Sequence, residues 1–150
     1  MSWSLSETAA LALKAARGAG MAKGATNMAL HYAMDRKTFG KAIAEHQAIQ
    51  LKLAEMSTRA AAAELLVHQA ADKFDRHERC DLEAGQAKFF ASEAAVQNSL
   101  DAMRVFGGYS YSPEYEIERF YRDAPLLCIG EGTNEIQRMI IAKQMVARAT

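Results

Sequence analysis

The clearest pattern in the chain is a run of apolar residues spaced four and three positions apart. It comprises Ile49, Leu53, Met56, Ala60, Ala63, Val67, Ala70 and Phe74. Apolar residues at this spacing fall on one face of an α-helix, and a sustained repeat is typical of a helix in a bundle. Many of these positions are alanine, so we expect a neighbouring helix to approach closely.

A first helix is expected before this run, from a capping box at Ser4 and Glu7 to about Met34. Its pattern is interrupted by three glycines, Gly18, Gly20 and Gly24. Glycine weakens a helix, but it also lets a second helix approach the backbone. Residues 35–48 break the helical pattern, and we expect a loop with one helical turn there.

After the run, Asp81 is placed to cap a helix that ends near Phe106 at a glycine pair. The apolar face expected for it is Leu82, Phe89, Val96, Leu100 and Met103. A short helix is predicted from Ser112-Pro113 to about Asp123. Thr133 is the expected N-cap of the last helix, whose predicted apolar face is Ile136, Met139, Ile140 and Met145.

The pattern as a whole predicts one all-α domain over residues 1–150. No segment shows the alternation of apolar and polar residues that is typical of a β-strand. The elements together predict a four-helix up-and-down bundle with a short extra helix. Half of the residues are hydrophobic and 24% are charged, which is the balance of a globular domain.

Charge and cysteine content argue against several kinds of partner and site. Eighteen basic residues balance eighteen acidic ones, so we expect neither nucleic acid nor a membrane as partner. No apolar stretch approaches the length of a membrane span. The cysteines, Cys80 and Cys128, and the four scattered histidines form no ligand cluster, so no metal site is expected. The start lacks the basic region of a signal peptide, and we expect a cytoplasmic protein, or a mitochondrial matrix protein in a eukaryote.

Two segments that interrupt the helices carry residues suited to ligand binding. Arg36 and the backbone amides near Gly40 are suited to holding a phosphate, although an exposed loop between helices would explain them too. Gly107 and Gly108 allow a ligand to approach the backbone closely, although a pair of glycines also ends a helix.

A third segment places Glu131 between two glycines, after the apolar residues 126–129. Loss of water around a carboxylate raises its pKa, which suits a general base. The start of the following helix offers free backbone amides and the positive end of the helix dipole to an anion. A helix start with solvated carboxylates is the competing interpretation.

Four motifs from these segments and their surroundings occur in a fixed order. They are Arg36-Lys37-Thr38-Phe39-Gly40 with Ile43 and Gln47, Phe-Gly-Gly-Tyr at 106–109, Arg122-Asp123-Ala124, and Glu-Gly-Thr-Asn-Glu-Ile-Gln-Arg at 131–138. Their order and spacing resemble the C-terminal helical domain of the acyl-CoA dehydrogenases. The resemblance covers roughly residues 18 to 148, and four motifs in register are far more specific than any one of them.

This resemblance implies a flavin enzyme that removes hydrogen from the α and β carbons of an acyl-CoA. Glu131 would be the base that takes the α-proton, and its backbone amide would polarise the thioester carbonyl. The β-hydrogen would leave as a hydride to FAD. The implied FAD contacts are Arg36, Phe39 and Gln47 toward an adjacent subunit's FAD, Gly107 and Gly108, and Thr133 and Glu135 toward the FAD of their own subunit.

The resemblance also implies that the chain is part of a larger enzyme. The family's N-terminal helical domain and middle β-domain are absent, so we expect the isolated chain to be inactive and leave its own binding of FAD open. Family bundles form the core of homotetramers, so a dimer or tetramer is expected. The alternative is a non-catalytic bundle that serves as an oligomerisation module, and an acyl-CoA oxidase also stays open.

Overall fold

The computed structural model describes the backbone of residues 5–130 and 132–149. Side chains are described for residue 8, residues 10–130 and residues 132–149. The predicted capping box at Ser4 and Glu7 therefore lies outside the described residues, and so does Glu131.

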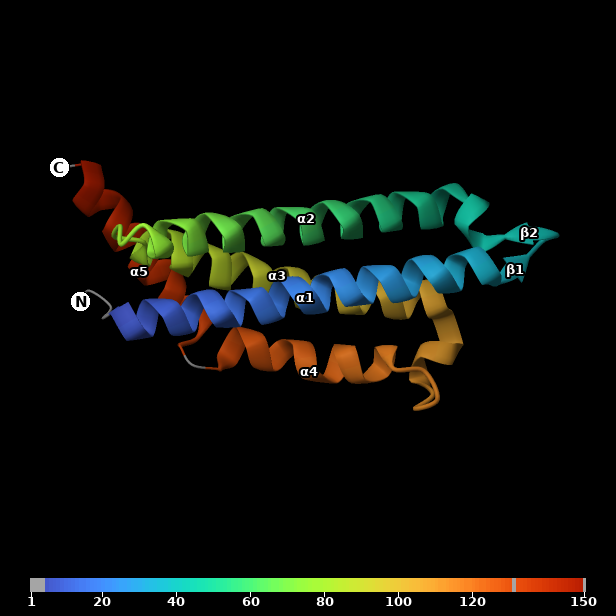
Figure 1. Ribbon diagram of the computed structural model, residues 1–150. Helices are drawn as coiled ribbons and strands as arrows, with labels where there is room; N and C mark the ends of the chain where they lie inside the picture. The colour runs from blue at the N-terminus through green and yellow to red at the C-terminus, as the bar shows by residue number, and fades with distance from the viewer. Residues whose placement is uncertain (1–4, 131, 150) are drawn as a thin grey trace.

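The described residues form an up-and-down bundle of four helices with a fifth helix at one end (Figure 1). The bundle helices are α1 (Leu5–Asp35), α2 (Gln47–Asp75), α3 (Asp81–Phe106) and α4 (Ile117–Ile129). The fifth helix, α5 (Asn134–Ala149), packs on α3. The predicted fold class is confirmed, although the extra helix is α5 and the short helix α4 is the fourth member of the bundle.

Helices α1 and α3 form the centre, with α2 and α4 on opposite sides of this pair (Figure 1). Small residues allow the close approach of α1 and α3. A Cβ atom on Gly18 would lie 2.8 Å from the backbone carbonyl carbon of Ala91, so a larger residue would push the helices apart. A Cβ atom on Gly24 would lie 2.9 Å from the ring of Phe120 in α4. Gly20 has no such neighbour within 4 Å, so only two of the three glycines fill the predicted role.

The apolar run that predicted α2 faces the core. Its buried members are Met56, Ala60, Ala63 and Ala70, and the other four are partly buried. These small residues pack against α1 and α3 of the same chain. The run therefore forms the interior of the bundle and is not a surface for self-association.

The apolar face predicted for α5 is wrong, and the face predicted for α3 is only partly buried. In α3 the five predicted residues are only partly buried. The buried positions are mostly small residues, together with Lys88, Val105 and Phe106, because this helix has neighbours on several sides. In α5 the predicted face is largely exposed, with exposed fractions of 46% for Ile136, 72% for Met139 and 56% for Met145. Polar side chains take the buried positions of α5, namely Asn134, Gln137 and Gln144.

Residues 35–48 contain a small antiparallel ribbon that the sequence did not predict. Strands β1 (Lys37–Thr38) and β2 (Lys41–Ala42) precede a 3₁₀ turn at Ile43–Glu45. The two turn residues, Phe39 and Gly40, have positive φ angles of 51° and 83°, as in the tight turns that match the twist of paired strands. Strands of two residues are too short to show alternation in a sequence.

The structure corrects the predicted starts of α4 and α3 and confirms the predicted N-cap of α5. Residues Gly107–Tyr111 form a 3₁₀ helix, and α4 begins only at Ile117 and continues through Pro125. The N-cap of α3 is Cys80, so the predicted cap, Asp81, is the first helical residue. At α5 the prediction is confirmed, because the Thr133 hydroxyl oxygen accepts a hydrogen bond from the backbone N–H of Ile136 at 3.5 Å.

Candidate functional site

A groove of about 620 Å³ opens at the end of the bundle where the β-ribbon meets the C-terminal end of α3. Residues from α1, from the ribbon and from the segment after α3 line it. Of the residues proposed from the sequence, it brings together Arg36, Phe39, Gly107 and Gly108.

Aromatic rings form much of the wall of this groove. The ring of Tyr32 stacks on that of Phe106, with centroids 4.1 Å apart and planes 17° from parallel. The guanidinium carbon of Arg36 lies 5.5 Å from the centroid of the Tyr109 ring, within the range of a cation–π contact. Burial raises the pKa of the Tyr32 hydroxyl, with Arg36 opposing the shift, so this hydroxyl is a neutral hydrogen-bond donor at pH 7.

Other parts of the groove are open. Phe39, at the ribbon's turn, is 98% exposed, so packing within the chain does not explain this aromatic residue. Its ring meets the ring of His46 edge-on at 6.2 Å, and His46 Nε2 lies 3.1 Å from Thr38 Oγ1 in a hydrogen bond. Added Cβ atoms on Gly107 and Gly108 would have no neighbour within 4 Å, so a ligand has free access to this backbone.

At the other end of the bundle, the loop between α4 and α5 is tied down by Lys88 of α3. This side chain is only 1% exposed. Its Nζ atom donates hydrogen bonds to the carbonyl oxygen of Gly132 at 2.8 Å, to Asn134 Oδ1 at 2.8 Å and to the carbonyl oxygen of Cys128 at 3.3 Å. Burial lowers the pKa of the Lys88 ammonium.

Thr133 and Glu135 lie at the start of α5, beside this loop. Thr133 is partly buried and caps the helix, while Glu135 is exposed. Hydrogen bonds from the backbone N–H of Glu135 and with Thr133 lower the pKa of the Glu135 carboxyl. Both residues thus have a structural role in starting α5, whatever else they contact.

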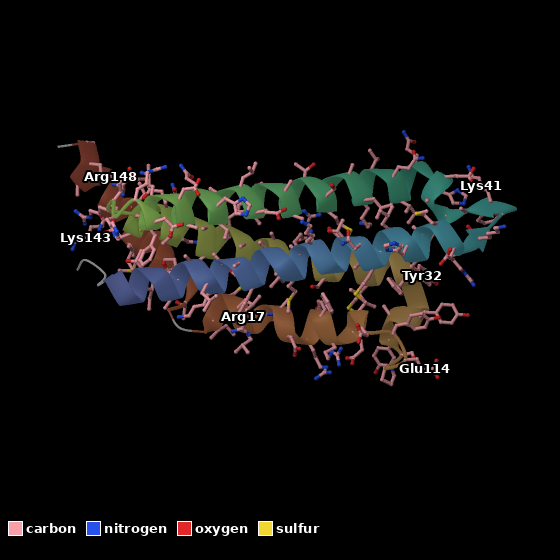
Figure 2. All side chains as sticks on the ribbon, viewed as in Figure 1. Arg17, Tyr32, Lys41, Glu114, Lys143 and Arg148 are labelled. Atoms are coloured by element: carbon pink, nitrogen blue, oxygen red, sulfur yellow. The ribbon has the colours of Figure 1, made fainter. Side chains whose placement is uncertain are left out.

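The two groups of residues lie far apart. Lys88 and Gly107 lie about nineteen residues apart along α3 and its C-cap, which corresponds to roughly 28 Å at 1.5 Å per residue. Figure 2 shows Tyr32, of the groove, and Arg148, of α5, toward opposite ends of the molecule. The predicted residues therefore form two partial sites and not one.

The family model for the acyl-CoA dehydrogenase C-terminal domain matches residues 10–146. The chain belongs to the acyl-CoA dehydrogenase family. An acyl-CoA dehydrogenase of Bacillus subtilis (strain 168) is 50% identical over 132 residues, which cover 88% of this chain and 35% of that protein. A 3-(aryl)acrylate reductase of Clostridium sporogenes (strain ATCC 15579) is 48% identical, with the same two coverages.

A solved structure shows the same acyl-CoA dehydrogenase domain. Butyryl-CoA dehydrogenase from Megasphaera elsdenii superposes with a TM-score of 0.92 and 36% identity, over 93% of this chain and 37% of that one. The chain thus spans about a third of the length of these relatives.

Within this acyl-CoA dehydrogenase domain, the structure separates the predicted cofactor residues. Gln47 is exposed at the first position of α2 and does not line the groove. The groove also includes Tyr109, from the Phe-Gly-Gly-Tyr motif, and Tyr32 and His46, which were not proposed as site residues. His46 directly precedes Gln47 in the same motif, so the motif held a signal for it, while Tyr32 enters only through the packing of α1.

The apolar residues 126–129, which precede position 131, leave two of their large side chains exposed to solvent. Leu126 is 62% exposed and Ile129 is 65% exposed, so these side chains do not by themselves remove water from the loop. Residues 5–130 and 132–149 include no helix that is long and apolar enough to cross a membrane. In the same part of the chain, no three histidine, cysteine or acidic side chains are placed to hold a metal ion.

Proposed function

We propose that this domain supplies the catalytic base, Glu131, and part of the FAD site of an acyl-CoA dehydrogenase. The family's N-terminal helical and middle β-domains would come from further polypeptide. The main support is that the motif containing Glu131 falls in the loop between α4 and α5, whose two ends are held on α3 by hydrogen bonds from the buried Lys88 side chain. Such a loop is suited to presenting a side chain in a fixed position.

The groove at the ribbon end has the chemistry that a dinucleotide needs. Tyr32, Phe106 and Tyr109 offer aromatic surface, the exposed Arg36 guanidinium suits a phosphate, and the glycine backbone is open. We propose that Arg36, Phe39, Gly107 and Gly108 contact FAD there, on the face toward an adjacent subunit. Thr133 and Glu135 would contact a second FAD at the loop end. Gln47, next to the groove residue His46, would contact the same FAD as Arg36 and Phe39.

In the proposed reaction, the carboxylate of Glu131 accepts the proton from the α-carbon of the acyl-CoA. The electron pair of that C–H bond forms the new double bond between the α and β carbons. The β-hydrogen leaves with its own electron pair, and FAD supplies the acceptor for this hydride. The backbone N–H of Glu131 would stabilise the negative charge that develops on the thioester oxygen. An acyl-CoA substrate fits a cytoplasmic protein, or a matrix protein in a eukaryote.

The test is the variant Glu131→Gln in the complete flavin enzyme, with butyryl-CoA, octanoyl-CoA and palmitoyl-CoA as probes. Loss of the base should slow the bleaching of the flavin absorbance by about 1,000-fold or more, since general bases contribute up to about 10⁴-fold. As a control, Glu64→Gln removes one partner of an exposed ion pair between Lys23 of α1 and Glu64 of α2, and it should bleach at the wild-type rate. Bleaching by Glu131→Gln at the wild-type rate would remove Glu131 from this role.

Exposed apolar residues on α5 support self-association as a second role. Met139, Met145 and Val146 are 72%, 56% and 66% exposed. An apolar groove of about 430 Å³ lies beside them, between α2, α3 and α5. We propose that this face forms the dimer or tetramer interface, which would serve either the complete enzyme or a non-catalytic oligomerisation module.

Met139→Glu should then shift the chain from oligomer to monomer in sedimentation velocity, because a charge at an apolar interface is left without solvent. Met34→Glu provides the control, since Met34 is 58% exposed at the opposite end of the bundle. An oligomer that survives Met139→Glu unchanged would place the interface elsewhere.

A further inference from the structure

Lys88 is an unusual residue for the interior of a helical bundle. It is one of the largest fully buried side chains of the described residues, and it is a cation. Its three hydrogen-bond acceptors are two backbone carbonyl oxygens and a side-chain amide oxygen, and none of them is a carboxylate. Burying a charge is costly, and the carboxylates of Glu93 and Glu135 favour the charged form of Lys88 without being bonded to it.

The geometry matches an ammonium group. Lysine offers three N–H donors only when it is protonated, and the Nζ atom has three oxygen acceptors at 2.8, 2.8 and 3.3 Å. The carbonyl of Cys128 belongs to the last turn of α4, where the negative end of the helix dipole favours a cation. The backbone of the loop and of the last turn of α4 thus supplies direct hydrogen bonds to the ammonium group.

The acceptors of Lys88 lie on both sides of position 131 along the chain. Cys128 lies at the end of α4, Gly132 in the loop and Asn134 at the start of α5. Residues 130, 132 and 133 of the loop belong to no helix or strand, and Gly132 has a φ of 96°, which few other residues adopt. One ammonium group therefore fixes both ends of the segment that contains residue 131.

Neighbouring residues of α3 complete this attachment. The side-chain amide of Asn134 donates to Ser92 Oγ at 3.0 Å and to Glu93 Oε1 at 2.8 Å. Ser92 lies one helical turn after Lys88, so both side chains emerge on the same face of α3. Helix α3 thus forms the platform on which the loop rests.

We propose that Lys88 is a positioning residue, whose ammonium group holds the loop between α4 and α5 so that residue 131 meets its substrate in a fixed place. The proposal rests on the function proposed above for Glu131. Lys88 acts through the backbone of the loop and not on the substrate.

Lys88→Met is the main variant, because methionine has a similar length and no donors. Hydrogen–deuterium exchange of the whole 150-residue chain should show the amides of residues 130–134 exchanging about 30-fold faster, as the loop loses hydrogen bonds to a charged group. Amides in the middle of α2 should change less than about 3-fold. Asn134→Ala, which removes one acceptor and is less disruptive, should show the same pattern with a smaller increase.

Asn98→Ala is the matched control. Asn98 is a second buried polar residue of α3, and its side-chain amide donates to the carbonyl oxygens of Ala22 and Met56 and to Thr26 Oγ1. Its loss should loosen the contacts among α1, α2 and α3. Amide exchange should then increase more in the middle of α2 than in residues 130–134. Equal acceleration of exchange across the bundle in Lys88→Met and Asn134→Ala, or unchanged loop amides in both, would overturn the proposal.

The complete flavin enzyme separates positioning from stability. Lys88→Met should lower the rate constant of flavin bleaching by about 100-fold, since a misplacement of about 1 Å has such effects, with less than about 3-fold change in the dissociation constant for the best acyl-CoA probe. Asn98→Ala, compared at equal folded fraction, should keep the rate within about 3-fold. Equal rate losses in the two variants would reduce Lys88 to a purely structural residue.

These experiments distinguish the two proposals from each other. If Glu131→Gln keeps wild-type bleaching, the function proposed for Glu131 fails, while the exchange data still decide whether Lys88 holds the loop. If Glu131→Gln loses bleaching but Lys88→Met keeps it, only the positioning role fails.

Discussion

The two ends of the bundle are built in opposite ways. At the ribbon end, Phe39 is 98% exposed, Arg36 is exposed, and the backbone of Gly107 and Gly108 has open space around it. At the loop end, Lys88 and Asn134 are almost fully buried and use their polar atoms within the chain. The first end presents groups to something outside the chain, and the second end holds its own loop in place.

This difference matches the different tasks proposed for the two partial sites, which are FAD binding at the ribbon end and proton transfer at the loop end. A residue that performs proton transfer needs a rigid support, because catalysis depends on sub-ångström placement. A surface that contacts a large cofactor from one side can keep its side chains exposed until the cofactor and the remaining domains cover them. The comparison predicts that changes at the loop end cost stability, while changes to the exposed side chains of the ribbon end mainly cost binding.

The largest stability effect is expected from Glu83, which ties α5 to α3 and α2 at the loop end. Its carboxylate accepts from Arg148 of α5 at 2.7 Å and from Lys73 of α2 at 2.6 Å, and its side chain is only 6% exposed. Glu83→Gln should lower the free energy of unfolding at pH 7 by about 3 kcal/mol, measured by urea denaturation. The exposed pair of Lys23 and Glu64 offers the control, and Glu64→Gln should cost less than about 1 kcal/mol.

The pH dependence of stability tests the same network. Burial alone would raise the pKa of Glu83, but the hydrogen bonds from Arg148 and Lys73 outweigh it and lower the pKa to about 2. The folded state therefore binds the proton less readily than the unfolded state. The stabilisation is complete above the unfolded pKa of about 4.5 and is lost as the pH falls toward 2. Urea denaturation at about five pH values between 6 and 2 should show that the free energy of unfolding falls less steeply with pH in Glu83→Gln than in the wild type. Parallel curves for the two proteins would contradict this.

The sequence predicted the helices well because long periodic patterns dominate a bundle. The run on α2 and the close approach at Gly18 followed directly from residue size and spacing. The faces of α3 and α5 did not, because a helix packed on several sides, or one attached by polar contacts, does not follow the rule that its largest apolar residues face inward. Asn134 and Gln137 of α5 are buried for reasons that only the contacts with α3 reveal.

Only those residues of the candidate site that lie in the sequence motifs could be predicted. Arg36, Phe39, Gly107 and Gly108 do share a groove, although they come from segments about 70 residues apart in sequence. Lys88 was missed because no local pattern marks a lysine as buried, and lysine is almost never fully buried. Its partners lie 40 to 46 residues further along the chain, so the contact exists only in the folded structure.

An intermediate effect is expected where the ribbon end needs a special backbone conformation. Gly107, the C-cap of α3, has a φ of 62° and a ψ of −138°, a combination that residues with a side chain rarely adopt. Gly107→Ala should therefore cost about 2 kcal/mol in urea denaturation of the chain. Gly108→Ala is a matched control with equally open surroundings and no positive φ, and it should cost less than about 0.5 kcal/mol. Equal costs would show that the conformation of Gly107 is not the cause.

The smallest effect on stability, and the sharpest test of the comparison, is expected at Arg36. Its guanidinium is exposed, lies over the Tyr109 ring and forms no ion pair with the described residues, so Arg36→Ala should change the free energy of unfolding by less than about 0.5 kcal/mol. In the complete enzyme the same variant should weaken FAD retention about 10-fold, because a charge-assisted hydrogen bond to a phosphate is lost. Lys37→Ala is the control, since Lys37 is an exposed neighbouring cation that does not line the groove. If both variants retain FAD equally well, general positive charge and not Arg36 serves this end of the bundle; if Arg36→Ala instead unfolds the chain, the contrast between a binding end and a stabilising end is wrong.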